Sequence, residues 1–310
     1  VEILARAGSN PAQFGDYSAE IIGKGVTISN SDITGATVGI DIKGNTITVL
    51  NNVDVDDPTA FAVRASGNNN VYIDGLDVSH SSVGANSAYG FYTESTSSGK
   101  QEIKNSAFNG LETAVYLTND VDTTISATTI SNGNTGLRVG AQSAANHIFS
   151  DLTINNNDVG VKADGTGSLT MTDVDINSVT TDVEITDGNS ITFLDGVVDD
   201  TKLVFDSTST GTFDRDRTYT AVLTADGVGL DATNVVLSSR DAATSSSGTT
   251  DATGQTEGLS FSVYDYDATG MTDYSGFFNT YTLSSVGMVS YSWTDGTTND
   301  ADFRYIQTSP

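Results

Sequence analysis

The stretch VTISNSDITGATVGIDIKG, residues 26–44, alternates apolar and polar side chains, with small or polar residues where the alternation breaks. Alternation with a period of two is typical of strands that bury one face. A related stretch, LTINNNDVGVKADG, stands at residues 152–165. This recurrence predicts a fold built by repeating one short β unit.

One small or polar residue marks each repeat, in steps of 22, 23, 30, 22, 24, 22 and 22 residues: Asn30, Asn52, Gly75, Asn105, Ala127, Asp151, Asp173 and Asp195. Two positions earlier stands an apolar residue: Ile28, Leu50, Ile73, Ile103, Ile125, Phe149, Met171 and Phe193. Three positions later stands another: Ile33, Val55, Val78, Phe108, Ile130, Ile154, Ile176 and Val198. A third apolar column follows: Ile40, Phe61, Phe91, Val115, Leu137, Val161, Val183 and Leu203.

A unit of this length holds three short strands and three bends, and it cannot bury its own apolar edge. Stacked copies align each apolar column into a continuous core, with every strand paired in parallel to its equivalent one turn away. We therefore expect an all-β chain with a parallel β-helix over residues 1–212, in which residues 1–19 cap the first coil. Small and polar residues are expected at the bends, where their side chains can form ladders.

These repeats resemble the pectate-lyase-like right-handed parallel β-helix superfamily over residues 20–206. The resemblance implies the fold. It leaves the activity open, because that superfamily includes lyases, hydrolases, epimerases, phage tailspikes, adhesins and surface-layer components.

Periodicity ends after Phe205, and residues 213–310 contain strand-like stretches separated by Gly and Asp turns: YTAVLTA, TNVVLSS, LSFSVYDYD, NTYTLSSVG and MVSYSW. This pattern predicts a β-sandwich. The runs NVVLSS and TTDATGQTEGLSFSV resemble immunoglobulin-like, carboxypeptidase-regulatory-like domains of prokaryotic surface proteins. In those domains a Thr-Asp-x-x-Gly turn, here Thr250, Asp251 and Gly254, links two strands. The resemblance implies a spacer or connector, and Trp293 is assigned to its core.

The chain carries 40 acidic and 13 basic residues, a net charge of −27. Such a surface repels nucleic acid and anionic membranes, which are excluded as partners. The absence of cysteine excludes disulfides and thiolate metal sites. No apolar run is long enough to predict membrane insertion.

The outward face of the third strand is the candidate site, because it gathers basic and aromatic residues in a basic-poor chain: Arg64, Tyr92, Glu94, Tyr116, Arg138 and Lys162. One interpretation is a glycan face, where tyrosines hold a sugar ring and arginines its carboxylate or sulfate. The other is structural, with the basic groups neutralising neighbouring Asp and Glu. An insertion at residues 79–89 should lie beside this face, either as a recognition loop or as a surface excursion.

No catalytic residues are assigned. His80 and His147 stand in different repeats and are interpreted as surface residues. Asn119-Asp120 is similar to one element of the polygalacturonases, but their Gly-His-Gly and Arg-Ile-Lys elements are missing. For a lyase, the nearest arrangement is Arg64 or Arg138 with Glu94 and Asp164. Calcium is the one cofactor considered, with Asp54, Asp56 and Asp57 as candidate ligands.

The composition and the missing catalytic sets favour a non-enzymatic extracellular module: part of a surface layer, filament or adhesin of a marine or archaeal prokaryote. Its expected partners are copies of itself or other surface proteins. Two alternatives stay open: a polysaccharide-active enzyme, either a uronate lyase or an epimerase, and a lectin-like glycan binder using the third-strand face.

Overall fold

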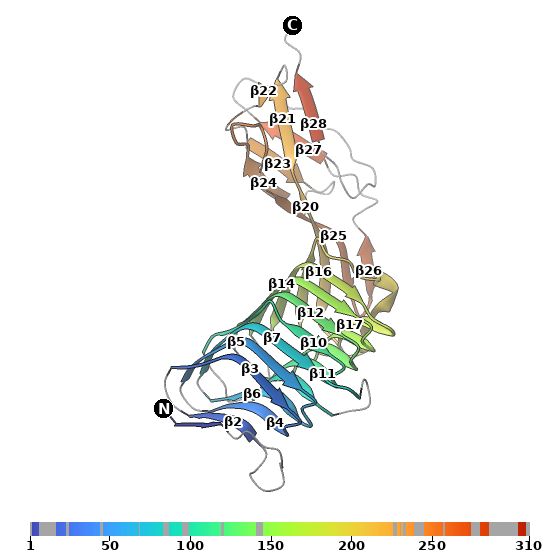
Figure 1. Ribbon diagram of the computed structural model, residues 1–310. Helices are drawn as coiled ribbons and strands as arrows, with labels where there is room; N and C mark the ends of the chain where they lie inside the picture. Colours follow the sequence, from blue (N-terminus) through green and yellow to red (C-terminus); the bar gives the residue numbers. More distant parts are fainter. Residues whose placement is uncertain are drawn as a thin grey trace. The chain divides into compact units, whose positions relative to one another are not determined.

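The computed structural model describes residues 2–5, 17–22, 25–43, 46–67, 69–82, 87–94, 99–118, 121–140, 145–225, 228–229, 231, 234–238, 245–256, 258–273, 280–284 and 303–307 (Figure 1). Most of these residues are in β-strands, and their one helical element is a 3₁₀ turn, η1 (Asp200–Lys202). The chain divides into two compact units, Val1–Thr212 and Phe213–Pro310. The described residues include no helix of the length and apolarity that a membrane crossing requires.

The first unit is a stack of coils, as the periodicity predicts. One sheet, called here the third-strand sheet, takes one strand from each coil: β2 (Tyr17–Ile22), β4 (Val38–Lys43), β6 (Phe61–Ser66), β8 (Tyr89–Thr93), β11 (Thr113–Leu117), β13 (Thr135–Val139), β15 (Val159–Ala163), β17 (Thr181–Ile185) and β19 (Leu203–Phe205). These strands pair in parallel, and β1 (Glu2–Ala5) joins β2 antiparallel at the end. The parallel β-helix is therefore confirmed.

A second sheet, called the bent sheet, takes the rest of each coil: β3 (Val26–Thr34), β5 (Thr46–Asp56), β7 (Asn69–Ser79), β9 (Gln101–Lys104), β10 (Ala107–Asn109), β12 (Thr123–Ser131), β14 (Asn146–Asn155), β16 (Ser168–Asn177) and β18 (Ser190–Leu194). These strands too pair in parallel, coil upon coil. In Figure 1 the strands of the two sheets follow one another from the blue coils to the yellow-green coils.

The bend inside the second sheet falls on the small or polar residue that marks each repeat. All eight of these residues have positive φ, between 47° and 74°. Asn, Asp and Gly adopt this left-handed conformation at low cost, which explains why they recur there, and Ala127 is the exception. Side chains at the bends also bond between coils: Asn52 Nδ2 donates to Asn30 Oδ1 at 3.4 Å.

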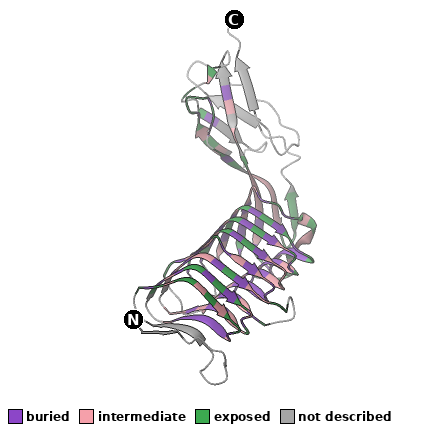
Figure 2. Ribbon diagram, in the orientation of Figure 1, coloured by how far each residue is buried: buried purple, intermediate pink, exposed green. Residues whose placement is uncertain are grey.

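The apolar columns form the interior, and Figure 2 shows buried and exposed positions alternating along the strands. The column from Leu50 to Phe193 is in register from coil to coil and at most 1% exposed. Ile130 and Ile176 are buried in the next column, while Ile33 in the first coil is half-buried.

Two predictions about individual side chains were wrong. Phe61 was placed in the third apolar column, but Val63 pairs with Ile40 and Phe91 there, and Phe61 faces outward. Both residues are apolar and two positions apart, so alternation alone did not separate them. His147 was interpreted as a surface residue, but it is 1% exposed and its ring stacks on Phe149 at 6.0 Å.

The second unit contains antiparallel pairs of β20 (Thr212–Tyr219) with β25 (Leu259–Asp267) and of β25 with β26 (Gly270–Asp273). Two three-stranded sheets accompany them: β21 (Ala221–Ala225) between β22 (Val228–Gly229) and β28 (Phe303–Gln307), and β23 (Asn234–Ser238) between β24 (Ser245–Thr249) and β27 (Thr280–Ser284). Four of the five predicted strand-like stretches are strands here. The fifth, MVSYSW with Trp293, lies outside the described residues, and the immunoglobulin-like sandwich stays a prediction.

The predicted Thr-Asp-x-x-Gly turn links β24 to β25. Asp251 Oδ1 accepts hydrogen bonds from the backbone nitrogens of Thr253 (2.8 Å) and Gln255 (3.1 Å). Gly254 follows with φ 84°, a conformation that favours glycine. The carboxylate therefore organises the reversal of the chain.

Candidate functional site

The third-strand face presents one column of outward side chains in register over seven coils: Asp41, Arg64, Tyr92, Tyr116, Arg138, Lys162 and Glu184. Neighbours in the column are about 4.8 Å apart, the spacing of paired strands. The structure thus brings five of the six candidate residues into a single column. Glu94, the sixth, follows the end of β8, and its Oε1 lies 3.9 Å from Arg64 Nη1.

At the first of these coils, Arg64 holds a buried carboxylate. Its Nε donates to Asp41 Oδ1 at 2.9 Å and its Nη2 to Asp41 Oδ2 at 2.6 Å. Lys43 Nζ lies 2.9 Å from the same Oδ2, and the Asp41 side chain is fully buried. A buried carboxylate is tolerated only when it is paired in this way. The guanidinium of Arg64 is therefore engaged in an ion pair within the protein.

Arg138 and Lys162 are paired in the same manner further along the column. Arg138 Nε and Nη2 each lie 2.8 Å from Asp164 Oδ2, and Lys162 Nζ lies 2.6 Å from Glu184 Oε1. Burial opposes the charged form of Arg138, but the hydrogen bond and charge of Asp164 outweigh it and raise the arginine pKa. The basic groups of this face are therefore matched by carboxylates from adjacent coils.

Between these pairs lies a cluster of four aromatic rings, the aromatic cluster: Phe61, Tyr89, Tyr92 and Tyr116. Ring centroids lie 4.9 to 5.9 Å apart, and all four side chains are half-buried. Arg138 Cζ lies 4.7 Å from the centre of the Tyr116 ring, within cation–π range. Burial, followed by the nearby charge of Glu94, raises the pKa of Tyr92.

Phe61 and Tyr89 are members of this cluster that the sequence reasoning missed. They pair directly, residue to residue, in the outward column beside that of Tyr92. Tyr89 closes the insertion at residues 79–89, so the insertion contributes one ring to the face.

Comparison with known families agrees with this architecture. Residues 89–235 match the family described as "Right handed beta helix region". The matched span is just under half of the chain, and it runs from β8 through the later coils into the second unit. No curated protein and no solved structure matches the chain. The comparison supports the β-helix fold and carries no information about an activity.

Of the candidate calcium ligands, Asp54 and Asp56 lie near the end of β5 and Asp57 directly follows it, and the last two accept hydrogen bonds within the protein. Asp56 Oδ1 accepts from Ser79 Oγ at 2.6 Å, and Asp57 Oδ1 accepts from the Ser81 nitrogen at 2.7 Å. The second contact lowers the pKa of Asp57. In the parts of the chain that the structure describes, no three acidic or histidine side chains converge as a metal site. Calcium binding at Asp54, Asp56 and Asp57 stays a prediction.

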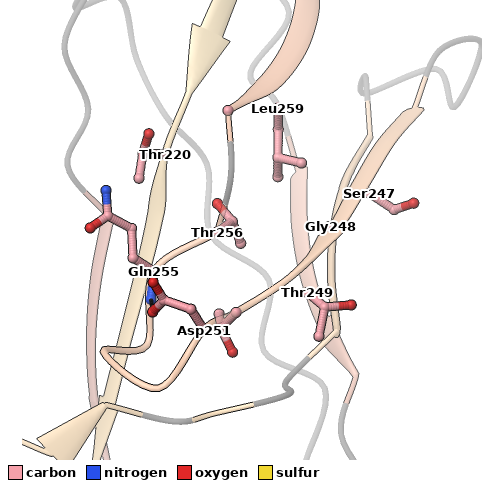
Figure 3. Close-up of a pocket in the computed structure, with 10 residues that line it drawn as sticks. Thr220, Ser247, Gly248, Thr249, Asp251, Gln255, Thr256 and Leu259 are labelled. Atoms are coloured by element: carbon pink, nitrogen blue, oxygen red, sulfur yellow. Dashed lines mark hydrogen bonds between the residues drawn. The ribbon is translucent and has the colours of Figure 1, made fainter.

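The second unit carries a depression of about 870 Å³, shown in Figure 3. Hydroxyl, amide and glycine groups line most of it, and the lining residues are Thr220, the segment 247–251, Gln255, Thr256, Gly258 and Leu259. Its carboxylate, Asp251, already accepts the turn hydrogen bonds, so the lining offers hydroxyl groups and little charge for recognition.

Proposed function

We propose that the chain is a non-enzymatic structural or adhesive module of a prokaryotic cell surface, belonging to a surface layer, filament or adhesin. In this proposal the coil stack serves as a stiff element and the second unit as an immunoglobulin-like connector. Its partners are other copies of the chain or other surface proteins.

The observation that carries the proposal is the pairing of charges on the third-strand face. Arg64 and Arg138 each make two contacts to a buried or nearly buried carboxylate of another coil. Such contacts hold successive coils together and engage both arginines within the protein. The parallel ladders of both sheets add to the same stiffness.

The pairing also argues against a lyase or epimerase on this face. A base that removes a proton from a uronate needs a pKa near the working pH. The pKa of Arg138 is raised, which makes loss of its proton harder. An incoming uronate carboxylate would in addition have to displace Asp164 or Asp41 from its arginine.

Self-association tests the structural proposal. Sedimentation velocity and negative-stain electron microscopy of the full chain, with and without calcium chloride, should show assemblies that grow with protein concentration. Incubation with polyuronates should give no unsaturated product, which is followed by its ultraviolet absorbance. A strictly monomeric particle that forms this product, with activity lost in Arg138→Ala, would overturn the proposal in favour of the enzyme.

The aromatic cluster favours a second candidate function, a lectin-like glycan binder on the third-strand face. Half-buried tyrosine rings offer apolar faces to a sugar and hydroxyls at their edges. Because the charges beside them are already balanced, the cluster suits sugars without a carboxylate or sulfate. Glycan-array binding that Tyr116→Ala abolishes, and that the second-unit variant Tyr264→Ala keeps, would support this function.

A further inference from the structure

A smaller hollow lies on the outer surface of the bent sheet, away from the third-strand column. Its volume is about 220 Å³, and its lining comes from β5, β7 and β9: Val49, Asn51, Tyr72, Ile73, Asp74, Glu102 and Lys104. Val49, Tyr72 and Glu102 stand in one outward column, and Asn51, Asp74 and Lys104 in the next. Three neighbouring coils therefore supply a two-by-three array of side chains, called here the Tyr72 hollow.

The charged groups in the Tyr72 hollow form ion pairs, either with each other or with Lys100 beside it. Lys104 Nζ lies 3.3 Å from Asp74 Oδ2, and Lys100 Nζ lies 3.0 Å from Glu102 Oε2. Asn105 Nδ2 donates to Asp74 Oδ1 at 2.8 Å. Two carboxylates and two ammonium groups thus cancel in charge while keeping further hydrogen-bonding capacity toward solvent.

We propose that the Tyr72 hollow binds one uncharged pyranose, such as the terminal sugar of a glycan chain. The half-buried Tyr72 ring, with Val49 beside it, offers an apolar surface to the C–H face of the sugar. Asn51, Asp74, Glu102 and Lys104 surround that surface with acceptors and donors for hydroxyl groups. The volume of about 220 Å³ is below the roughly 300–1,000 Å³ of drug-sized sites, so it suits one sugar ring.

The paired charges decide against an ionic ligand. A carboxylate or ammonium entering the hollow would have to break the Lys104–Asp74 or Lys100–Glu102 pair, whereas hydroxyls can bond to atoms that stay paired. Lys100 Nζ lies 5.9 Å from the Tyr72 ring centre, near the limit of a cation–π contact, and its side chain is 57% exposed. This lysine can therefore move aside when a sugar stacks.

The site is local to these coils. Later coils place Thr124, Ile148, Thr170 and Thr192 in the column of Tyr72, so they repeat the backbone and lack the ring. The later coils therefore serve as an internal control. They have the same pairing of strands, and they should not bind the sugar.

Saturation-transfer difference NMR on the full chain tests the proposal with methyl glucoside, methyl galactoside and methyl N-acetylglucosaminide, and with glucuronate as the charged probe. We expect at least one neutral glycoside to bind with a Kd on the order of 1 mM, as its few atoms allow. Glucuronate should bind at least tenfold more weakly.

Tyr72→Ala should weaken binding at least tenfold, and Tyr72→Phe should retain it. Tyr264→Ala is the matched control, because it removes a tyrosine of the second unit and should leave the signal unchanged. Circular dichroism confirms that each variant is folded. No signal from any neutral glycoside, an equal signal in Tyr72→Ala, or stronger binding of glucuronate would each overturn the proposal. None of these outcomes bears on self-association, which the structural proposal predicts separately.

Discussion

Acidification should destabilise the coil stack because of His147. Its ring is 1% exposed inside the stack, and burial lowers its pKa from 6.5 to about 4, against a smaller opposite effect of Asp122. Above pH 6.5 the imidazole is neutral in both the folded and the unfolded chain, so it contributes no pH dependence. Between pH 6.5 and 4 only the unfolded chain takes up the proton, and stability falls as the pH falls.

The size of this effect follows from the difference between the two pKa values. A shift from 6.5 to about 4 corresponds to about 3 kcal/mol, at 1.36 kcal/mol per pKa unit. Some acids act in the opposite direction. Desolvation, followed by neighbouring carboxylates, raises the pKa values of Asp77 and Asp173, so acid relieves unfavourable charge there. The loss of stability that His147 causes must therefore be measured by comparing the wild type with a variant that lacks this histidine.

Urea unfolding followed by circular dichroism at pH 7 and pH 4 measures this contribution of His147 to the free energy of unfolding. His147→Leu is the variant that cannot ionise. Leucine suits the position because Leu169 occupies the same place in the next coil. The wild type should lose about 3 kcal/mol more than His147→Leu between the two pH values. Equal losses in the wild type and His147→Leu would refute the reasoning.

Three further substitutions test the packing, each by urea unfolding at pH 7. Arg64→Ala leaves the buried Asp41 carboxylate without its two-point partner and should cost about 3 kcal/mol; a loss below about 1 kcal/mol would contradict that role. Ala127→Asn should stabilise by about 1 kcal/mol, because asparagine tolerates φ 47° better than alanine, and a destabilised variant would count against the strain argument. Gly90→Ala should destabilise by roughly 1–3 kcal/mol, since its Cβ would lie 2.4 Å from the Ala114 carbonyl oxygen; an unchanged midpoint would show that the coils can separate there.

The sequence by itself determined the β-helix, because the residue types within each repeat specify its strands and its bends. Apolar residues recur two before and three after each marker residue, and from the second coil onward they are buried. Seven of the eight markers are Asn, Asp or Gly, which accept positive φ, so their residue types alone indicate the bends, with Ala127 as the exception. His147 was visible too, because it stands two positions before Phe149 and shares its face. Interpreting His147 from its residue type alone placed it wrongly on the surface.

The tertiary structure decided what faces outward and what it contacts. In the third strand both Phe61 and Val63 are apolar, and only pairing with Ile40 and Phe91 selects Val63 for the interior. That choice sends Phe61 outward to complete the aromatic cluster. The partners of Arg64 and Arg138 lie 23 and 26 residues away in the chain and meet them only because the coils stack in register. Contacts between coils depend on this register, which no single repeat contains.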